Sequence, residues 1–151
     1  MSLELHTEKK DLFSVPATYR LAHCISSDFA LGAGIAKEFD KRYNMRDLLY
    51  INYHDYQQIY TTNNIKGDCL PIGRVYNLVT KPLYYNKPTY KSLRFSLERM
   101  RFYMINENVT KLAMPKIGCG LDKLEWTKVL NIIIEVFENY PLPLDILICE
   151  L

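Results

Sequence analysis

The chain has 151 residues, 48% of them hydrophobic and 24% charged, a balance typical of one globular domain that can bury a core without disulfides or metals. Its formal net charge of +2 is too small to indicate a general nucleic-acid-binding protein, whereas it is compatible with an anionic small ligand. We therefore expect a single domain over residues 1–151.

Cysteine usage points to a reducing compartment. The four cysteines, at positions 24, 69, 119 and 149, form no CxxC pair and lie in apolar or glycine-flanked runs, which favours free thiols in the cytoplasm or nucleus over a disulfide framework or a zinc site. With no other clustered ligands we expect no metal and no cofactor. The first ten residues are polar and no apolar run approaches 18 residues, so neither a signal peptide nor a membrane span is expected.

The first half of the chain alternates strand and helix patterns. Residues 3–6 and 19–25 are predicted strands, the second largely buried. Residues 33–43 carry apolar side chains at helical spacing, and residues 44–56 are predicted to form a second helix or a turn. Residues 65–73 are rich in turn-forming residues, so we expect turns there.

The second half continues the alternation. It predicts three strands, at residues 74–80, 111–115 and 144–149, and two helices, at residues 89–105 and 126–140. A loop between two prolines, at residues 82–88, separates the first strand from the first helix. Thr89 is a candidate N-cap for the first of these helices. The whole pattern predicts an α/β layered domain with a central sheet covered on both faces. Ligands of such sheets bind outside the carboxyl ends of the strands, so the loops there are the candidates for chemistry.

The first candidate loop, residues 26–36 (SSDFALGAGIA), places Gly32 and Gly34 between a strand and a helix. Glycines let the backbone approach a ligand closely, and a helix N-terminus offers free N–H groups and a positive dipole end, which suits a diphosphate. A plain tight turn explains the same glycines, and the stretch is not the dinucleotide GxGxxG motif.

The second candidate loop, residues 115–126 (PKIGCGLDKLEW), repeats this arrangement with Gly118 and Gly120. Two such loops can hold one diphosphate from both sides. The alternative is a turn in which Asp122 caps the following helix.

Individual side chains leave further alternatives open. Lys81 follows a buried strand and could act as a nucleophile if partly desolvated, although most lysines are solvated surface residues. Cys119 could be a thiol nucleophile near a helix N-terminus, or only a small residue in a tight loop. His23 lies within an apolar strand, which favours a hydrogen-bonded core histidine over a catalytic one.

Taken together, these loops resemble the macrodomain family, in its terminal ADP-ribose protein glycohydrolase branch. The matching stretches run in order from about residue 10 to residue 151: DLF, LAHCIS, LGAGIA, VTK, KPTY and MPKIGCGLD, followed by Trp126. Each is unspecific alone, but the ordered set is specific. The resemblance implies a three-layer α/β/α sandwich around a mixed sheet.

The resemblance also implies a reaction. Lys81 would attack C1″ of the distal ribose, displace the carboxylate of a modified glutamate or aspartate, and form a lysyl–ADP-ribose intermediate. Asp122 would act as the acid/base that helps to resolve it. The implied protein is therefore a hydrolase that reverses ADP-ribosylation, works as a monomer, and has ADP-ribose and ADP-ribosylated proteins as partners.

The same resemblance implies a set of ligand contacts. Asp11, Leu12 and Leu151 would meet the adenine, and the remaining contacts to ribose and phosphate would come from Ser26, Gly32, Ala33, Gly34, Ile35, Thr80, Lys116, Ile117, Gly118, Cys119, Gly120 and Leu121. Two positions depart from the family pattern: Lys10 stands where glycine is usual, and the chain ends Cys149-Glu150-Leu151 where an aromatic residue is common.

Three other activities use the same pocket. A phosphatase would act on ADP-ribose 1″-phosphate, a DNA ADP-ribosyl glycohydrolase would take nucleic acid only as the modified substrate, and a reader would bind ADP-ribose without cleaving it. The presence of both Lys81 and Asp122 argues against the reader, since binding requires no nucleophile.

Overall fold

A computed structural model describes residues 3–150. The strands are β1 (Leu3–Lys9), β2 (Arg20–Ser26), β3 (Asp68–Ile72), β4 (Val75–Lys81), β5 (Lys111–Met114) and β6 (Leu144–Glu150). The helices are the 3-10 turn η1 (Leu12–Ser14) and α1 (Gly34–Tyr43), α2 (Met45–Asn52), α3 (Tyr56–Thr62), α4 (Tyr90–Asn106) and α5 (Trp126–Phe137).

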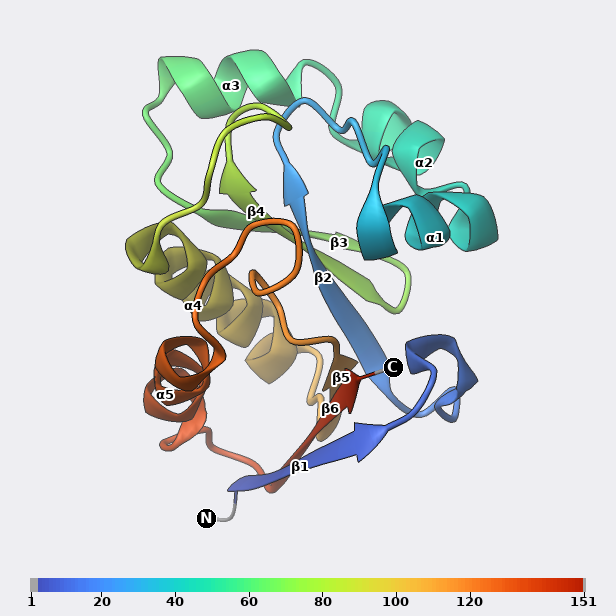
Figure 1. Ribbon diagram of the computed structural model, residues 1–151, viewed down its shortest axis with the longest axis vertical. Coiled ribbons are helices and arrows are strands. Elements are labelled where there is room, and N and C mark those ends of the chain that lie inside the picture. The colour runs from blue at the N-terminus through green and yellow to red at the C-terminus, as the bar shows by residue number, and fades with distance from the viewer. Residues whose placement is uncertain (1–2, 151) are drawn as a thin grey trace.

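All six strands join one sheet in the order β1-β6-β5-β2-β4-β3. Only β3 runs antiparallel to its neighbour β4, and every other pair is parallel. The parallel arrangement brings the carboxyl ends of β2, β4 and β5 to one edge, where the connecting loops gather (Figure 1).

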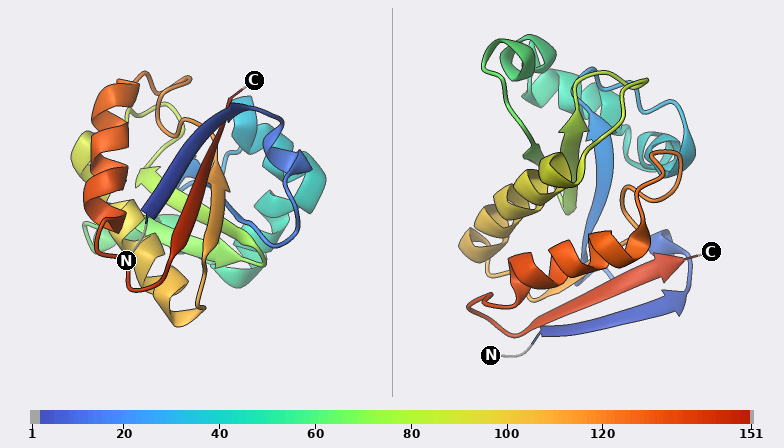
Figure 2. Two further views of the ribbon diagram at one scale, coloured as in Figure 1. Left: turned by 90° about the horizontal axis from the view of Figure 1, so that it is seen from below. Right: turned by 60° about the vertical axis from the view of Figure 1, so that its left-hand side comes forward.

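The sheet is covered on both faces, because its strands alternate between two cores with a period of two residues. In β5, Leu112 and Met114 pack against α4 and α5, whereas Ala113 faces α1, α2 and α3. Figure 2 shows the two groups of helices on opposite sides of the sheet. The predicted three-layer α/β/α sandwich around a mixed sheet is therefore confirmed.

The predicted elements are recovered with three differences. Residues 65–73 were expected to form turns, but they contain β3, an edge strand in which Pro71 is tolerated because one side of an edge strand needs no ladder donor. Residues 44–56 contain the helix α2, and α3 follows it without a clear apolar period. The last helix ends at Phe137, three residues earlier than expected.

Two local predictions hold. Thr89 caps α4, with its side chain accepting from Ser92 N while Ser92 reciprocates. His23 is a core histidine: it is fully buried, stacks on Phe39, and lies with Nε2 2.6 Å from Asn77 Oδ1. Since the Asn77 amide nitrogen donates to the Leu70 carbonyl, the imidazole is the donor in that contact.

Within residues 3–150, no helix combines the length and apolar character needed to cross a membrane.

Candidate functional site

A cavity of about 850 Å³ opens at the carboxyl ends of β2, β4 and β5. Its walls come from the three loops that leave those strands. Most of the predicted site residues line it: Ser26, Gly32, Ala33, Gly34, Ile35, Lys81, Lys116, Ile117, Gly118, Gly120, Leu121 and Asp122.

Lys81 and Asp122 meet at this cavity. Lys81 is the last residue of β4 and Asp122 lies in the loop after β5, and Lys81 Nζ is 2.7 Å from Asp122 Oδ1. Both side chains are largely shielded, with 13% and 16% of their surface exposed. The cavity thus places an amine beside a group able to take or return its proton, which is what covalent catalysis with proton transfer requires.

The loop after β2 is held by Asp28. This carboxylate accepts from Ser26 Oγ at 2.5 Å and from the Ala30 backbone at 3.3 Å, and its second oxygen accepts from Tyr84 N at 3.0 Å. Phe29, which lies between Asp28 and Ala30, is buried and has a φ of 53°, in the left-handed region. The loop after β2 and the loop after β4 are therefore fixed to each other, and the cavity wall they form is preorganised.

The helix α1 presents its N-terminus to the cavity. No side chain caps it, its first turn has no acidic residue, and Ala33, Gly34, Ile35 and Ala36 all line the cavity. Uncapped N–H groups with the positive end of the helix dipole favour an anion at this point. This supports the diphosphate interpretation of the glycine loop over a plain turn.

The loop after β5 contains one glycine whose backbone conformation other residues rarely adopt. Gly118 has φ +73°, in the left-handed region, and a Cβ there would lie 2.9 Å from a Leu124 methyl. Asp122 does not cap the following helix, because α5 begins at Trp126 with Glu125 at the N-cap position. The capping alternative for Asp122 is therefore wrong, and its carboxylate forms an ion pair with Lys81 instead.

The thiols near the cavity are poor nucleophiles. Burial raises the pKa of Cys24 to about 12, and burial also raises the pKa of Cys119, whose Sγ donates to the Ile117 carbonyl. Both thiols stay protonated near neutral pH. Cys119 does not line the cavity, and it is best described as a small residue in a tight loop.

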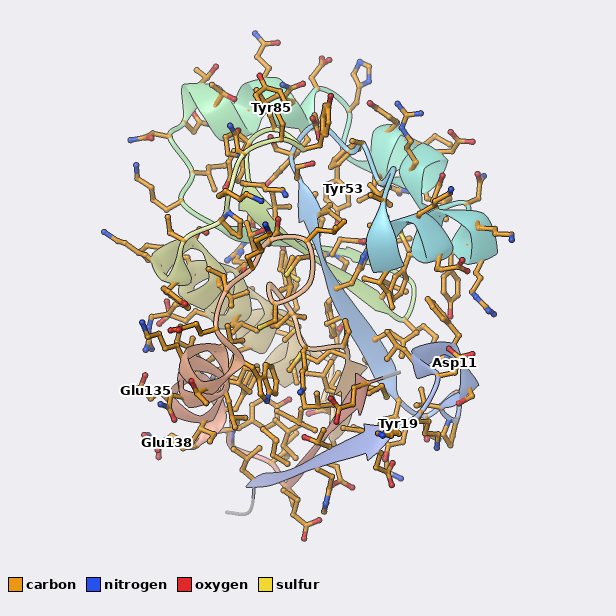
Figure 3. All side chains as sticks on the ribbon, in the orientation of Figure 1. Asp11, Tyr19, Tyr53, Tyr85, Glu135 and Glu138 are labelled. Carbon is orange, nitrogen blue, oxygen red and sulfur yellow. The ribbon has the colours of Figure 1, made fainter. Side chains whose placement is uncertain are left out.

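Three further predicted contacts, Thr80, Asp11 and Leu12, do not line this cavity. Thr80 lines a second, smaller cavity. Asp11 caps η1, with Oδ1 accepting from Phe13 N, and Leu12 is buried in the core. Figure 3 shows Asp11 beside η1, well separated from Tyr85 on the loop after β4. Leu151 falls outside the described residues.

The region of Asp11 nevertheless adjoins one end of the cavity. Lys116, which lines it, forms an ion pair of 2.8 Å with Glu150. The Glu150 carbonyl in turn accepts from Lys10 N at 2.9 Å. A ligand extending past Lys116 would therefore approach the chain just before Asp11, so the predicted adenine contacts stay a prediction.

Sequence reasoning missed the residues of the loop between Pro82 and Pro88. Tyr84, Tyr85, Asn86 and Lys87 line the cavity next to Lys81. Their position was available from the sequence, because they follow a buried strand just as the two glycine loops do. Nothing in their composition marked them, since tyrosines occur throughout the chain.

Among residues 3–150, one group could offer three metal ligands: Glu4, His6 and Asp145. None of these residues lines either cavity, and Glu4 and His6 are exposed. This surface group does not change the expectation that the cavity holds no metal.

No family model matches the chain, but individual proteins do. A Bos taurus protein named ADP-ribose glycohydrolase OARD1 is 42% identical over 134 residues, which cover 86% of this chain and 82% of that protein.

Solved structures have the same fold. The macrodomain of Thermus aquaticus DarG gives a TM-score of 0.75 at 18% identity and covers 99% of this chain and 100% of that one. Thermosipho africanus DarTG, solved in complex with ADP-ribose, gives a TM-score of 0.67 at 18% identity over 96% of this chain and 41% of that one.

Proposed function

The chain belongs to the macrodomain family, and from this premise we propose that it is an ADP-ribose glycohydrolase that removes mono-ADP-ribose from glutamate and aspartate side chains. The 42% identity to a protein named ADP-ribose glycohydrolase and the Lys81–Asp122 pair in the cavity support this proposal. The four cysteines, all free, support an intracellular enzyme, and we take it to be a monomer.

ADP-ribose fits the cavity by size and by charge. A volume of about 850 Å³ is within the usual range for small-molecule sites. The uncapped N-terminus of α1 would receive the diphosphate, with the distal ribose between the two glycine loops. C1″ would then lie against Lys81.

The first chemical step uses Lys81 as nucleophile. One proton passes from the Lys81 ammonium to Asp122, and the neutral amine attacks C1″. The bond between C1″ and the ester oxygen breaks, its electron pair leaves with the glutamate or aspartate carboxylate, and a bond joins Lys81 Nζ to C1″. The distance of 2.7 Å between Asp122 Oδ1 and that nitrogen supports this proton transfer.

The second step releases the sugar. Asp122, having lost its proton to solvent, takes a proton from a water molecule that attacks C1″. The bond from C1″ to Nζ breaks, and the lysine leaves as an amine that regains a proton through Asp122. The products are ADP-ribose and the original ammonium–carboxylate pair.

The observation that carries the proposal is the direct contact of Lys81 with Asp122 in the cavity wall. A reader of ADP-ribose needs neither group, and a phosphatase needs no amine nucleophile. The DNA-directed alternative uses the same pair, and it differs only in the acceptor.

A panel of three substrates tests the proposal. Protein ADP-ribosylated on carboxylates, ADP-ribose 1″-phosphate and ADP-ribosylated DNA are incubated with the wild type and with Lys81→Ala, and free ADP-ribose is quantified. We expect release from the protein substrate by the wild type alone. Release by Lys81→Ala at near wild-type rate would refute the lysine mechanism, and turnover of only the phosphate or the DNA substrate would reassign the activity.

A further inference from the structure

The loop after β4 places two exposed aromatic rings beside the proposed nucleophile. Tyr84 and Tyr85 are 64% and 66% exposed, line the main cavity, and contact each other edge to face with ring centroids 5.3 Å apart. Figure 3 shows Tyr85 at the upper end of the molecule. Exposed aromatic surface next to a cavity is typical of a recognition surface rather than of solvated packing.

This loop is held in place at several points. Ser27 Oγ donates to the Pro82 carbonyl at 2.7 Å, Asp28 accepts from Tyr84 N, and Lys87 Nζ donates to the Leu121 carbonyl at 3.2 Å. The rings are therefore presented on a backbone that is already ordered, so binding to them costs little conformational entropy.

The substrate chemistry limits what can occupy this surface. In the proposed reaction, the bond that breaks joins C1″, held against Lys81, to the acceptor residue. Whatever carries that residue must extend out of the cavity, and Tyr84 and Tyr85 follow Lys81 by three and four positions. A small leaving group would end inside the cavity, whereas a polypeptide continues past its rim.

Lysines on the other side of the loop of residues 82–88 favour an acidic acceptor. A second cavity of about 320 Å³ lies there, and Lys81 and Lys87 line both cavities. Lys66 adds a third ammonium group, and no carboxylate is among the lining residues that the structure describes. Lys81 is already paired with Asp122. Among residues 3–150, Lys66 and Lys87 donate only to neutral oxygens, of Asn64 and Leu121.

Thr80 strengthens this assignment, since it also lines the second cavity and its buried hydroxyl has no hydrogen-bond partner among the described residues. Buried polar groups are normally paired. Ammonium groups that lack carboxylate partners, together with an unused hydroxyl, suit the carboxylate of a ligand.

We propose that the loop of residues 82–88 binds the acceptor polypeptide, with Tyr84 and Tyr85 contacting the chain next to the modified residue and the second cavity receiving an acidic side chain of the same segment. This inference rests on the proposed function. It names the substrate class as ADP-ribosylated acidic segments of protein.

Three substrates with the same ADP-ribosyl ester bond separate these contributions: the acetate ester of ADP-ribose at C1″, a glutamate-modified peptide with neutral flanks, and the same peptide with acidic flanks. For the double variant Tyr84→Ala/Tyr85→Ala, we expect the loss in kcat/KM to be about tenfold greater on both peptides than on the acetate ester, as expected for two aromatic contacts to the polypeptide. Phe102→Ala, which removes an exposed ring from α4, is the matched control. Equal losses on all three substrates, or no loss, would overturn the assignment of Tyr84 and Tyr85.

A second variant, Lys66→Gln, tests the preference for acidic flanks. The wild type should favour the acidic-flank peptide severalfold at low salt, and Lys66→Gln should abolish that preference while leaving the neutral-flank peptide unchanged. Lys91→Gln, an exposed lysine of α4 that lines neither cavity, should retain it. Equal wild-type rates on the two peptides would overturn the acidic assignment while leaving the proposed function intact. If the wild type cleaves none of the three substrates, the proposed function fails and this inference fails with it.

Discussion

Lys81 and Thr80 are adjacent in sequence but differ in position, because successive side chains of a strand point to opposite faces. Lys81 lines both cavities, whereas Thr80 lines the second cavity and not the main one. Lys81 reaches Asp122 beside the main cavity. A register shift of one residue would exchange them. The register of the last two residues of β4 thus decides whether an amine lies beside Asp122.

His23 makes the stability of the fold depend on pH. Burial lowers its pKa from 6.5 to about 4. Between those pH values the unfolded chain binds a proton that the native histidine does not, so its contribution to stability is complete above pH 6.5 and is lost as the pH falls toward 4. From pH 7.5 to pH 5 this one group should remove about 2 kcal/mol of stability.

Urea unfolding of the wild type and of His23→Gln at both pH values tests this. The variant should lose about 2 kcal/mol less than the wild type on acidification, because its amide does not titrate. Equal losses in the two proteins would contradict this contribution of His23.

The loop between β5 and α5 depends on a single backbone conformation. Gly118 has φ +73° and lines the cavity, and an alanine with such a φ costs about 1–2 kcal/mol. We expect Gly118→Ala to lower the midpoint of thermal unfolding by several degrees and to weaken ADP-ribose binding, since the strain falls on the cavity wall.

Gly120→Ala is the matched control for that change. Gly120 lines the same cavity, but a Cβ there meets nothing within 4 Å and its φ is not in the left-handed region. Melting curves and ADP-ribose titrations should therefore place Gly120→Ala close to the wild type. A loss of similar size in both variants would show that any side chain in this loop is harmful, irrespective of φ.

The elements that could be predicted are those with a strong local signal. The strand that ends at Lys81 is a buried run, and the helix α4 has both an apolar face and the Thr89 cap. The strand β3 was missed because its sequence contains a proline and an aspartate, which are uncommon in strands. Its pairing with β4 is what makes it a strand. Tertiary contacts override local propensity in such edge strands.

The candidate site was predictable in a different way. The glycine loops followed from the rule that ligands bind at the carboxyl ends of parallel strands, but local patterns left Lys81 as one lysine among many. Its proposed role came from the family resemblance, and its contact with Asp122 came from the fold. The second cavity had no sequence signal, because it is lined by separate segments, from Tyr60 to Ser92.

At the scale of the whole molecule, one ligand would link loops from three strands. A ligand that binds only the native state stabilises it by about 2.7 kcal/mol at 100 times its dissociation constant. For a domain of this size that is about 5–10 °C in the unfolding midpoint. We expect such a shift with ADP-ribose, and a smaller one with AMP, which lacks the second phosphate and the distal ribose. The absence of any shift at saturating ADP-ribose would contradict the assignment of the cavity.

In the proposed mechanism, Lys81 forms a covalent bond to the sugar and Asp122 helps to break it. Asp122 assists proton transfer in both steps, and a positioned acid/base contributes about 10²–10⁴ in rate. With Asp122→Ala we expect the second step to be slowed more than the first, so that the intermediate accumulates, whereas Lys81→Ala cannot form it at all.

Intact-protein mass spectrometry after exposure to a carboxylate-linked substrate measures this directly. Asp122→Ala should carry one ADP-ribosyl adduct that peptide mapping places on Lys81, and both Lys81→Ala and the double variant should carry none. An adduct on another residue, or rapid release of ADP-ribose by Lys81→Ala, would contradict the mechanism.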